Sequence, residues 1–369
     1  MKKIAIIGAN EAITLLINKA KDLGYETHVF AWECGDPGES VADFFYPISI
    51  DEKELILQKC KEINVDGVCS ITSDLASPTV NYVARKLKLN SNLPEAEILA
   101  RDKYQMRCAF RNAGIFTPKF YEATAEYDVY ELADNIGFPM IVKPTDRWSS
   151  KGVNRVNSIS ELKDALDIAI NESLNNKAIV EEFIEGDEYS AECICYNGEY
   201  HILAYTQKYT TGFPHYIESG HYQPALLDER IQKECVEVFS IALEALGIIN
   251  GAAHIEFKVD SMGRICIIEI GARMGGDCIG TFLTPISTGM DYVRMVIDVA
   301  CGNPPCFDKI SKPVSVEVKF IVNIQDYIDI FKQKVALPDK VIQVGNIDFE
   351  FSRDVIDSST RHGCFVIKR

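Results

Sequence analysis

The sequence predicts an α/β fold that begins with a doubly wound parallel sheet. Residues 3–7 form a short apolar strand, residues 11–23 have the apolar spacing of a helix, and residues 27–31 form a second strand. A strand, a helix and a strand in this order build the first unit of a parallel sheet with helices on its faces. Farther along, residues 188–205 and 254–270 each form two strands joined by a short turn.

Length, composition and charge limit the class of protein. The 369 residues are enough for two or three domains, and 47% hydrophobic with 25% charged residues is an ordinary globular composition. The net charge of −16 argues against a sequence-independent nucleic-acid surface, because such a surface must be basic. We therefore expect no nucleic-acid partner.

The cysteines and the apolar runs predict a cytoplasmic protein. The twelve cysteines include no CxxC pair, which is typical of reduced thiols and disfavours a metal cluster. The first apolar run covers only residues 4–7, so we expect no signal peptide. No apolar run approaches the ~20 residues of a membrane-spanning helix, so we expect no membrane partner.

The first domain is predicted to end near residues 92–94. Its turn after the first strand lacks the GxGxxG fingerprint, with Asn10 and Ile13 at two of the glycine positions, which disfavours an NAD site. Residues 65–72 form a buried strand, and Asp74 follows at its carboxyl end, where open α/β sheets place ligand contacts. The favoured interpretation of Asp74 is an N-cap for a helix at 75–88.

Basic residues mark the next part of the chain. A helix at 95–113 carries Lys103 and Arg107 on one face, which alone could be a solvated cationic face. Lys143 ends an apolar strand at 140–143 and offers a fixed positive charge at a sheet edge. The polar turn at 146–154 has backbone N–H groups that can bind an anion, although its single glycine makes this signal weak.

Strands, a helix and a loop follow. Residues 160–171 form a helix with Ser160 as N-cap, and residues 178–184 form a strand. The hairpin at 188–205 turns on Asn197-Gly198, a strong type I′ signal. Residues 207–224 are expected to form an irregular loop that holds His215 and His221. Long loops are often functional, whereas surface histidines are usually inert.

The hairpin at 254–270 carries the clearest chemical signal. In its expected register Glu256 faces Glu269 on one side of the sheet, with Cβ atoms about 5 Å apart. Facing carboxylates repel, and a Mg²⁺ ion between them would remove the conflict. Arg273 lies four residues farther and could hold a phosphoryl oxygen. In the alternative, this is a solvated face on which Lys258 neutralises the glutamates.

These motifs, in this order, resemble those of the ATP-grasp superfamily. The set comprises Lys103, Lys143, SSKGV at 149–153, VEEFIEGDEYSAE at 180–192, Glu256 and EIGAR at 269–273. The resemblance covers roughly residues 95–305, and residues 1–93 are similar to the Rossmann-like domain that precedes such domains. It implies an ATP-grasp domain at 94–310, made of two α+β subdomains that enclose the nucleotide, with a lid at about 116–183. Residues 311–369 are left as a small strand-rich segment.

The resemblance also implies roles for individual residues. Lys103 and Lys143 would bind the ATP phosphates, and the loop of Ser149, Ser150, Lys151, Gly152 and Val153 would close over them. Glu181, with the backbone of Phe183 and Ile184, would recognise adenine, and Glu188 the ribose. Glu256 and Glu269 would hold Mg²⁺, with Mn²⁺ compatible with the same ligands. Arg273 would lie at the transferred phosphoryl group, so Arg273, Lys143 and Glu269 are the expected catalytic residues.

Two departures from the family pattern are visible. Many members have Asn where this chain has Gly271, so one metal ligand is missing. The closing loop also has fewer glycines than usual and contains Lys151, which leaves its phosphate contacts less defined.

The segments SGHYQP at 219–224 and EIGARMGGD at 269–277 most resemble amino-acid ligases that form dipeptides. His221, Arg273 and Asp277 would then bind the substrate. The implied reaction joins a carboxylate to an amine through an acylphosphate and releases ADP and phosphate. The alternatives are an enzyme that uses bicarbonate or formate, and a nucleotide-binding regulatory protein without turnover. An NAD-linked oxidoreductase rests only on the first domain. The expected partners are small carboxylates and amines, and the sequence is compatible with a homodimer.

Overall fold

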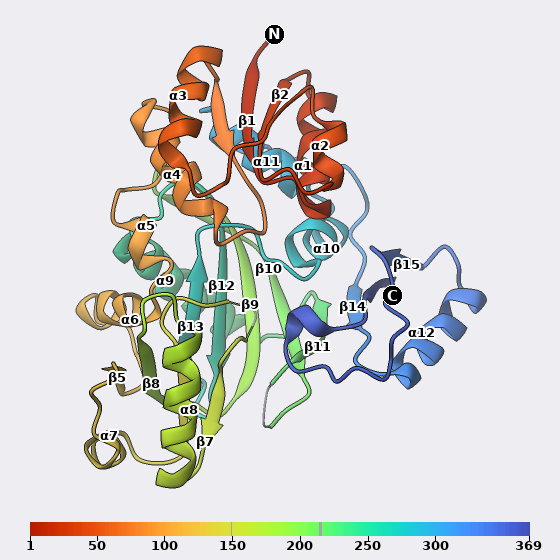
Figure 1. Cartoon of the computed structure of the whole chain (residues 1–369). Coiled ribbons are helices and arrows are strands. Elements are labelled where there is room, and N and C mark those ends of the chain that lie inside the picture. The colour runs from red at the N-terminus through yellow and green to blue at the C-terminus, as the bar shows by residue number, and fades with distance from the viewer. Residues whose placement is uncertain (149, 214–215) are drawn as a thin grey trace.

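The computed structural model describes residues 1–148, 150–213 and 216–369, and it contains three β-sheets (Figure 1). The N-terminal sheet has the order β3-β2-β1-β4, and every pairing in it is parallel. Its strands are β1 (Lys3–Ile7), β2 (Glu26–Phe30), β3 (Phe44–Tyr46) and β4 (Gly67–Cys69). Its helices are α1 (Glu11–Asp22), α2 (Pro37–Val41), α3 (Lys53–Ile63) and α4 (Ala76–Lys86).

Alternation along β1 explains why this sheet is covered on both faces. Ile4 and Ile6 pack in one buried cluster with Leu16 of α1. Ala5 and Ile7 point the other way and pack with residues of α3 and α4. The predicted doubly wound sheet is therefore confirmed.

The lid sheet is a separate, antiparallel sheet with the order β5-β8-β6-β7. It consists of β5 (Phe120–Ala123), β6 (Met140–Pro144), β7 (Asn154–Val156) and β8 (Ala178–Glu182), with helices α7 (Val129–Ile136) and α8 (Ile159–Glu172). Ser158, not the predicted Ser160, is the N-cap of α8, because its side chain accepts a hydrogen bond from Glu161 N.

The central sheet has eight strands in the order β13-β12-β9-β10-β11-β14-β16-β15. They are β9 (Asp187–Tyr196), β10 (Glu199–Thr210), β11 (Glu218–Gln223), β12 (Gly251–Val259), β13 (Ile265–Gly271), β14 (Val316–Phe320), β15 (Val341–Val344) and β16 (Cys364–Lys368). Asn197 and Gly198 both have positive φ, which confirms the predicted type I′ signal between β9 and β10.

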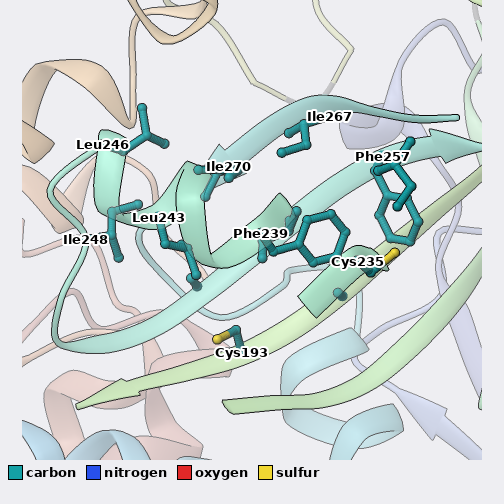
Figure 2. Close-up of a cluster of buried hydrophobic side chains, with 14 of the residues drawn as sticks. Cys193, Cys235, Phe239, Leu243, Leu246, Ile248, Phe257, Ile267 and Ile270 are labelled. Carbon is teal, nitrogen blue, oxygen red and sulfur yellow. The ribbon is translucent and has the colours of Figure 1, made fainter. Parts of the chain in front are cut away.

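One face of this sheet is apolar over β9, β12 and β13, and the other face is polar except where Ile194 and Ala252 pack with Tyr292 and Val296. Helix α9 (Glu229–Ala245) lays Phe239 and Leu243 on Phe257 and Ile270 of the hairpin (Figure 2). Residues Ala191 and Cys193 of β9 belong to the same buried cluster. Because side chains alternate along a strand, Glu188, Ser190 and Glu192 face the opposite side. That polar side is where the site described below lies.

The remaining helices are α5 (Ala96–Leu99), α6 (Lys103–Asn112), η1 (Ile279–Leu283), α10 (Thr284–Thr288), α11 (Tyr292–Ala300), α12 (Ile324–Ala336) and η2 (Ser358–Thr360). Of the helices described, none is long and apolar enough to cross a bilayer. The division at residues 93 and 310 stays a prediction. The central sheet takes strands from both sides of residue 310, and the C-terminal segment (residues 311–369) also contains α12.

Two predicted elements are wrong. The helix expected at 95–113 is two helices, because Asp102 caps a new helix that starts at Lys103. The loop expected at 207–224 is largely strand, since β10 continues to Thr210 and β11 begins at Glu218. His221 therefore lies on a central strand, and His215 lies outside the described residues.

Candidate active site

Two cavities meet above the polar face of the central sheet. The first, of about 210 Å³, lies between the central sheet and the lid sheet, with Lys143 and Glu181 from the lid in its wall. The second, of about 600 Å³, is lined by Ser73 and Asp74 at the carboxyl end of β4 and by the loop after β13. The residues that line both are Trp148, Lys208, Glu218, His254, Glu256 and Arg273.

The paired glutamates lie in the first cavity. Glu256 of β12 is the cross-strand partner of Glu269 of β13, as predicted. Phe257 pairs with Ile267, so Ile268 forms a bulge next to the glutamates. The carbonyl oxygen of Ile268 accepts a hydrogen bond of 2.8 Å from Arg107 Nη2. The bulge keeps the two carboxylates opposite each other although the turn shifts the rest of the register.

A lysine neutralises each glutamate. Lys208 Nζ lies 2.7 Å from Glu256 Oε1, and Lys103 Nζ lies 2.9 Å from Glu269 Oε1. Burial alone would raise the pKa of Glu256, but the charges of Lys208 and His254 hold it well below its usual range. The alternative role for Lys258 is wrong: its ammonium donates to the Ile184 carbonyl at 3.2 Å.

Glu181 joins the lid to α6. Its carboxylate lies 2.5 Å from Arg107 Nε and 2.6 Å from Lys143 Nζ. Burial would raise the pKa of Glu181, but the two cations outweigh it and lower the pKa to about 2. Lys103 and Arg107 are both buried, which excludes the solvated cationic face.

The side predicted for the adenosine is aromatic and basic. The ring of Phe183 lies between the Arg155 guanidinium, 4.2 Å from the ring centroid, and Lys258 Nζ, 4.9 Å from it. Arg155 also donates to the Tyr216 hydroxyl at 3.1 Å. Glu188 lies 3.1 Å from Lys208 Nζ. All of these residues except Arg155 line the first cavity, and Arg155 contacts Phe183 and Tyr216, which do.

Part of the closing loop also lines the first cavity. Ser150, Lys151 and Val153 lie in its wall, whereas Gly152 is placed against Pro144. Ser149 lies outside the described residues. The phosphate-binding role of this loop stays a prediction.

Arg273 lines both cavities but is held by Asp74. Arg273 Nε and Nη2 each lie 2.8 Å from a carboxylate oxygen of Asp74. Asp74 is therefore not the predicted N-cap, since the Ser73 hydroxyl accepts from Ala76 N at 3.2 Å instead. The pair also fills the space beside Gly271, where an added Cβ would lie 3.2 Å from Arg273 Nε and from Asp74 Oδ1. A side chain at position 271 would therefore press on this ion pair.

The predicted substrate residues lie on the second cavity. His221 is 1% exposed, and its Nε2 lies 3.9 Å from Asp277 Oδ2. Asp277 accepts from Arg361 Nη2 at 2.6 Å. Burial lowers the pKa of His221 despite the nearby Asp277 carboxylate. Of the predicted site residues that the structure describes, all except Gly152 line one of the two cavities.

The residues at or beside the site that were not predicted include Lys208, Glu192, His254 and Arg361. Glu192 is fully buried, contacts His254 Nδ1, and accepts from Gly275 N at 2.9 Å. His254 Nε2 lies 3.3 Å from Glu256 Oε1. The signal for Glu192 and His254 was alternation, which puts them on the same face as Glu188 and Glu256.

The two glutamates fit a magnesium ion whose other ligands are phosphate oxygens and water. In the described ranges no group of three His, Cys, Asp or Glu side chains is arranged to hold a metal. Two facing carboxylates, completed by phosphate oxygens and water, match the usual environment of Mg²⁺ in nucleotide enzymes. Glu256 and Glu269 are the residues that would hold it.

Known proteins similar to this chain indicate its fold and the class of protein that it resembles. The sequence profile described as "ATP-grasp domain" matches residues 136–281. The alanine–anticapsin ligase of Bacillus subtilis is 29% identical over 335 residues, which are 82% of this chain and 70% of that protein. Residues 136–281 therefore match an ATP-grasp domain.

Solved structures of two enzymes have the same fold. The L-amino acid ligase from Bacillus licheniformis has a TM-score of 0.81 at 24% identity, covering 100% of this chain and 93% of that one. An N5-carboxyaminoimidazole synthetase from Staphylococcus aureus, complexed with ADP, has a TM-score of 0.80 at 16% identity, with coverage of 100% and 93%. The proteins similar to this chain therefore include enzymes named as amino-acid ligases.

Proposed function

We propose that this protein joins the carboxylate of one amino acid to the amine of a second substrate through an acylphosphate. The observation that carries the proposal is the junction of the two cavities at Glu256, Arg273 and Lys208. A nucleotide in the first cavity and a substrate in the second would meet at these charged groups. The relatives named as amino-acid ligases support the choice of substrate.

The residues of the chain supply position and charge. When bound, Mg²⁺-ATP supplies the γ-phosphoryl group that turns a carboxylate into an acylphosphate, from which an attacking amine displaces phosphate. Lys103 and Lys143 neutralise phosphate oxygens, and Arg273 stabilises the charge that develops during transfer. Glu256 and Glu269 are the residues that would hold the metal. No nucleophilic side chain is required, so the catalytic contribution comes from orientation and electrostatics.

The second cavity favours this reading over the two alternatives. Bicarbonate and formate are much smaller than a cavity of about 600 Å³, whereas an amino acid with a second substrate could occupy it. The intact set of Glu256, Glu269 and Arg273 argues against a regulatory protein without turnover. Cytoplasmic location and a homodimer remain part of the proposal.

The test is ADP release from Mg²⁺-ATP by the purified chain, with each amino acid alone and in pairs. Amino-acid-dependent ADP release together with a new amide product, detected by mass spectrometry, is the expected result. ADP release that depends on bicarbonate or formate would replace it with the second function. Nucleotide binding without ADP release under any of these conditions would leave the regulatory protein.

A further inference from the structure

The C-terminal segment supplies part of the wall of the second cavity. Val344 and Ser358 line this cavity directly. Arg361 lies behind that wall, with its side chain only 9% exposed. Because this segment carries no recognisable motif, its contribution to the cavity comes from the fold alone.

Each side-chain nitrogen of Arg361 donates a hydrogen bond. Nη2 donates to Asp277 Oδ1 at 2.6 Å, Nη1 to the Glu218 carbonyl at 3.3 Å, and Nε to the Ser358 carbonyl at 2.7 Å. Its flat face lies 3.7 Å from the ring centroid of Phe320. A planar group held on its edges and on one face has little freedom, so it fixes the two acidic residues that it contacts.

Asp277 and Glu218 keep negative charge toward the cavity. Arg361 takes only Oδ1 of Asp277, whose side chain is 34% exposed. The Glu218 carboxylate accepts from the Ser358 hydroxyl and lies 3.8 Å from Lys208 Nζ. Lys208 also serves Glu188 and Glu256, so it does not neutralise Glu218 fully.

A buried histidine with an unpaired ring nitrogen lies in the same wall. His221 lines the second cavity, and its Nδ1 has no hydrogen-bond partner in the part of the chain that the structure describes. A buried polar nitrogen without a partner costs free energy. The wall therefore combines two carboxylates with an imidazole that is short of one partner.

We propose that Asp277 and Glu218 bind the ammonium group of the amino acid, and that Arg361 is the positioning residue that holds them in place. This inference rests on the proposed function and names the substrate group that the second cavity recognises. The carboxylate to be activated must lie at the junction, near Arg273. The ammonium group on the neighbouring carbon can then point into the second cavity.

The first test separates the amino acid from the nucleotide. Arg361→Met should raise the KM for the amino acid at least about tenfold, the effect of losing one charge-assisted hydrogen bond. The KM for ATP should change less than about twofold, because Asp277 and Ser358 line only the second cavity. Arg361→Lys keeps the charge but loses the planar guanidinium. Its KM for the amino acid should therefore lie between those of the unaltered protein and Arg361→Met. Arg369→Met is the matched control, since that arginine pairs with Glu317 in the same segment and lines neither cavity.

A second test needs no turnover. In the presence of a non-hydrolysable ATP analogue, calorimetric titration of the twenty amino acids should give binding that Asp277→Asn weakens at least about tenfold. Asp277→Asn keeps the size of the side chain and an acceptor for Arg361. Comparing the affinities for propionate and alanine tests recognition of the α-ammonium group. Comparing those for norleucine and lysine tests recognition of a side-chain ammonium group.

The outcomes distinguish the two claims. Unchanged amino-acid affinity in both Asp277→Asn and Arg361→Met would overturn this inference and leave the proposed function intact. Equal binding of propionate and alanine, and of norleucine and lysine, would also overturn it. If no amino acid binds to the unaltered protein, the proposed function fails together with the inference.

Discussion

At the scale of single residues, Glu181 carries one negative charge between two buried cations. Replacing it by Gln leaves Arg107 and Lys143 without a counter-charge, and breaking a buried ion pair in this way costs about 3–5 kcal/mol. We expect Glu181→Gln to unfold at a clearly lower temperature at pH 7. Glu182→Gln, one residue away and exposed, should change the melting temperature little.

The same residue predicts a dependence on pH. The folded pKa of Glu181 is about 2, below its usual value of 4.5, so the folded state binds the proton more weakly than the unfolded state. Its contribution to stability is complete above pH 4.5 and is lost as the pH falls toward 2. Denaturant unfolding at several pH values should show that Glu181→Gln loses less stability at acid pH than the unaltered protein. Equal slopes in both proteins would contradict the assignment.

Glu269 tests the metal-binding pair. Gln keeps the shape of the side chain but removes the charge, so ADP formation should fall by at least about a hundredfold while the fold remains. The control is Glu199→Gln, whose side chain is 78% exposed and which lies at the opposite end of β10 from Lys208. Retained turnover in Glu269→Gln would refute the role of this residue.

The sequence predicted the charged site residues that belong to a recognisable local pattern. It did not predict those that reach the site only through contacts with distant parts of the chain. Lys143, Glu256 and Glu269 could be predicted because each belongs to a strand with a clear end or a short turn. Lys208 was missed because β10 was expected to end at residue 205. Arg361 was missed because its partners Asp277 and Glu218 are more than eighty residues away along the chain.

At the scale of elements, the loop after β13 packs tightly against a buried ion pair. A Cβ on Gly275 would lie 2.4 Å from Glu192 Oε1 and 2.8 Å from His254 Nδ1. Gly275→Ala should therefore destabilise the protein by about 1–3 kcal/mol and weaken turnover by displacing His254 from Glu256. Gly276→Ala is the control, since no described heavy atom lies within 4 Å of its Cβ position. Equal melting temperatures for the two variants would argue against this packing.

Strand pairing explains which elements could be predicted. The β9–β10 hairpin follows from Asn197-Gly198, and the facing of Glu256 and Glu269 from the short turn. The bulge at Ile268 could not be predicted, because it depends on Arg107 reaching the Ile268 carbonyl. The strand β11 was read as a loop, since SGHY has weak strand propensity and is held by β10 and β14 on either side.

At the scale of the whole molecule, the C-terminal segment belongs to the same sheet as the site. Strands β14, β16 and β15 continue the central sheet beyond β11, and Val318 and Val366 pack with Leu283. Truncation after residue 310 would expose the edge of β11 and this apolar cluster, so we expect an aggregated product. Size-exclusion chromatography measures this. A monodisperse, folded chain of residues 1–310 would show instead that the segment is an independent unit.

The two lysines at the paired glutamates affect the order in which ligands arrive. A bare divalent ion has to displace the ammonium groups of Lys103 and Lys208, which lie 2.9 Å and 2.7 Å from the carboxylates. A triphosphate attracts both lysines to itself and so frees the carboxylates for the ion it carries. Metal and nucleotide should therefore enter as one complex. Titration with magnesium chloride alone should give little heat, and titration with Mg²⁺-ATP a saturable signal.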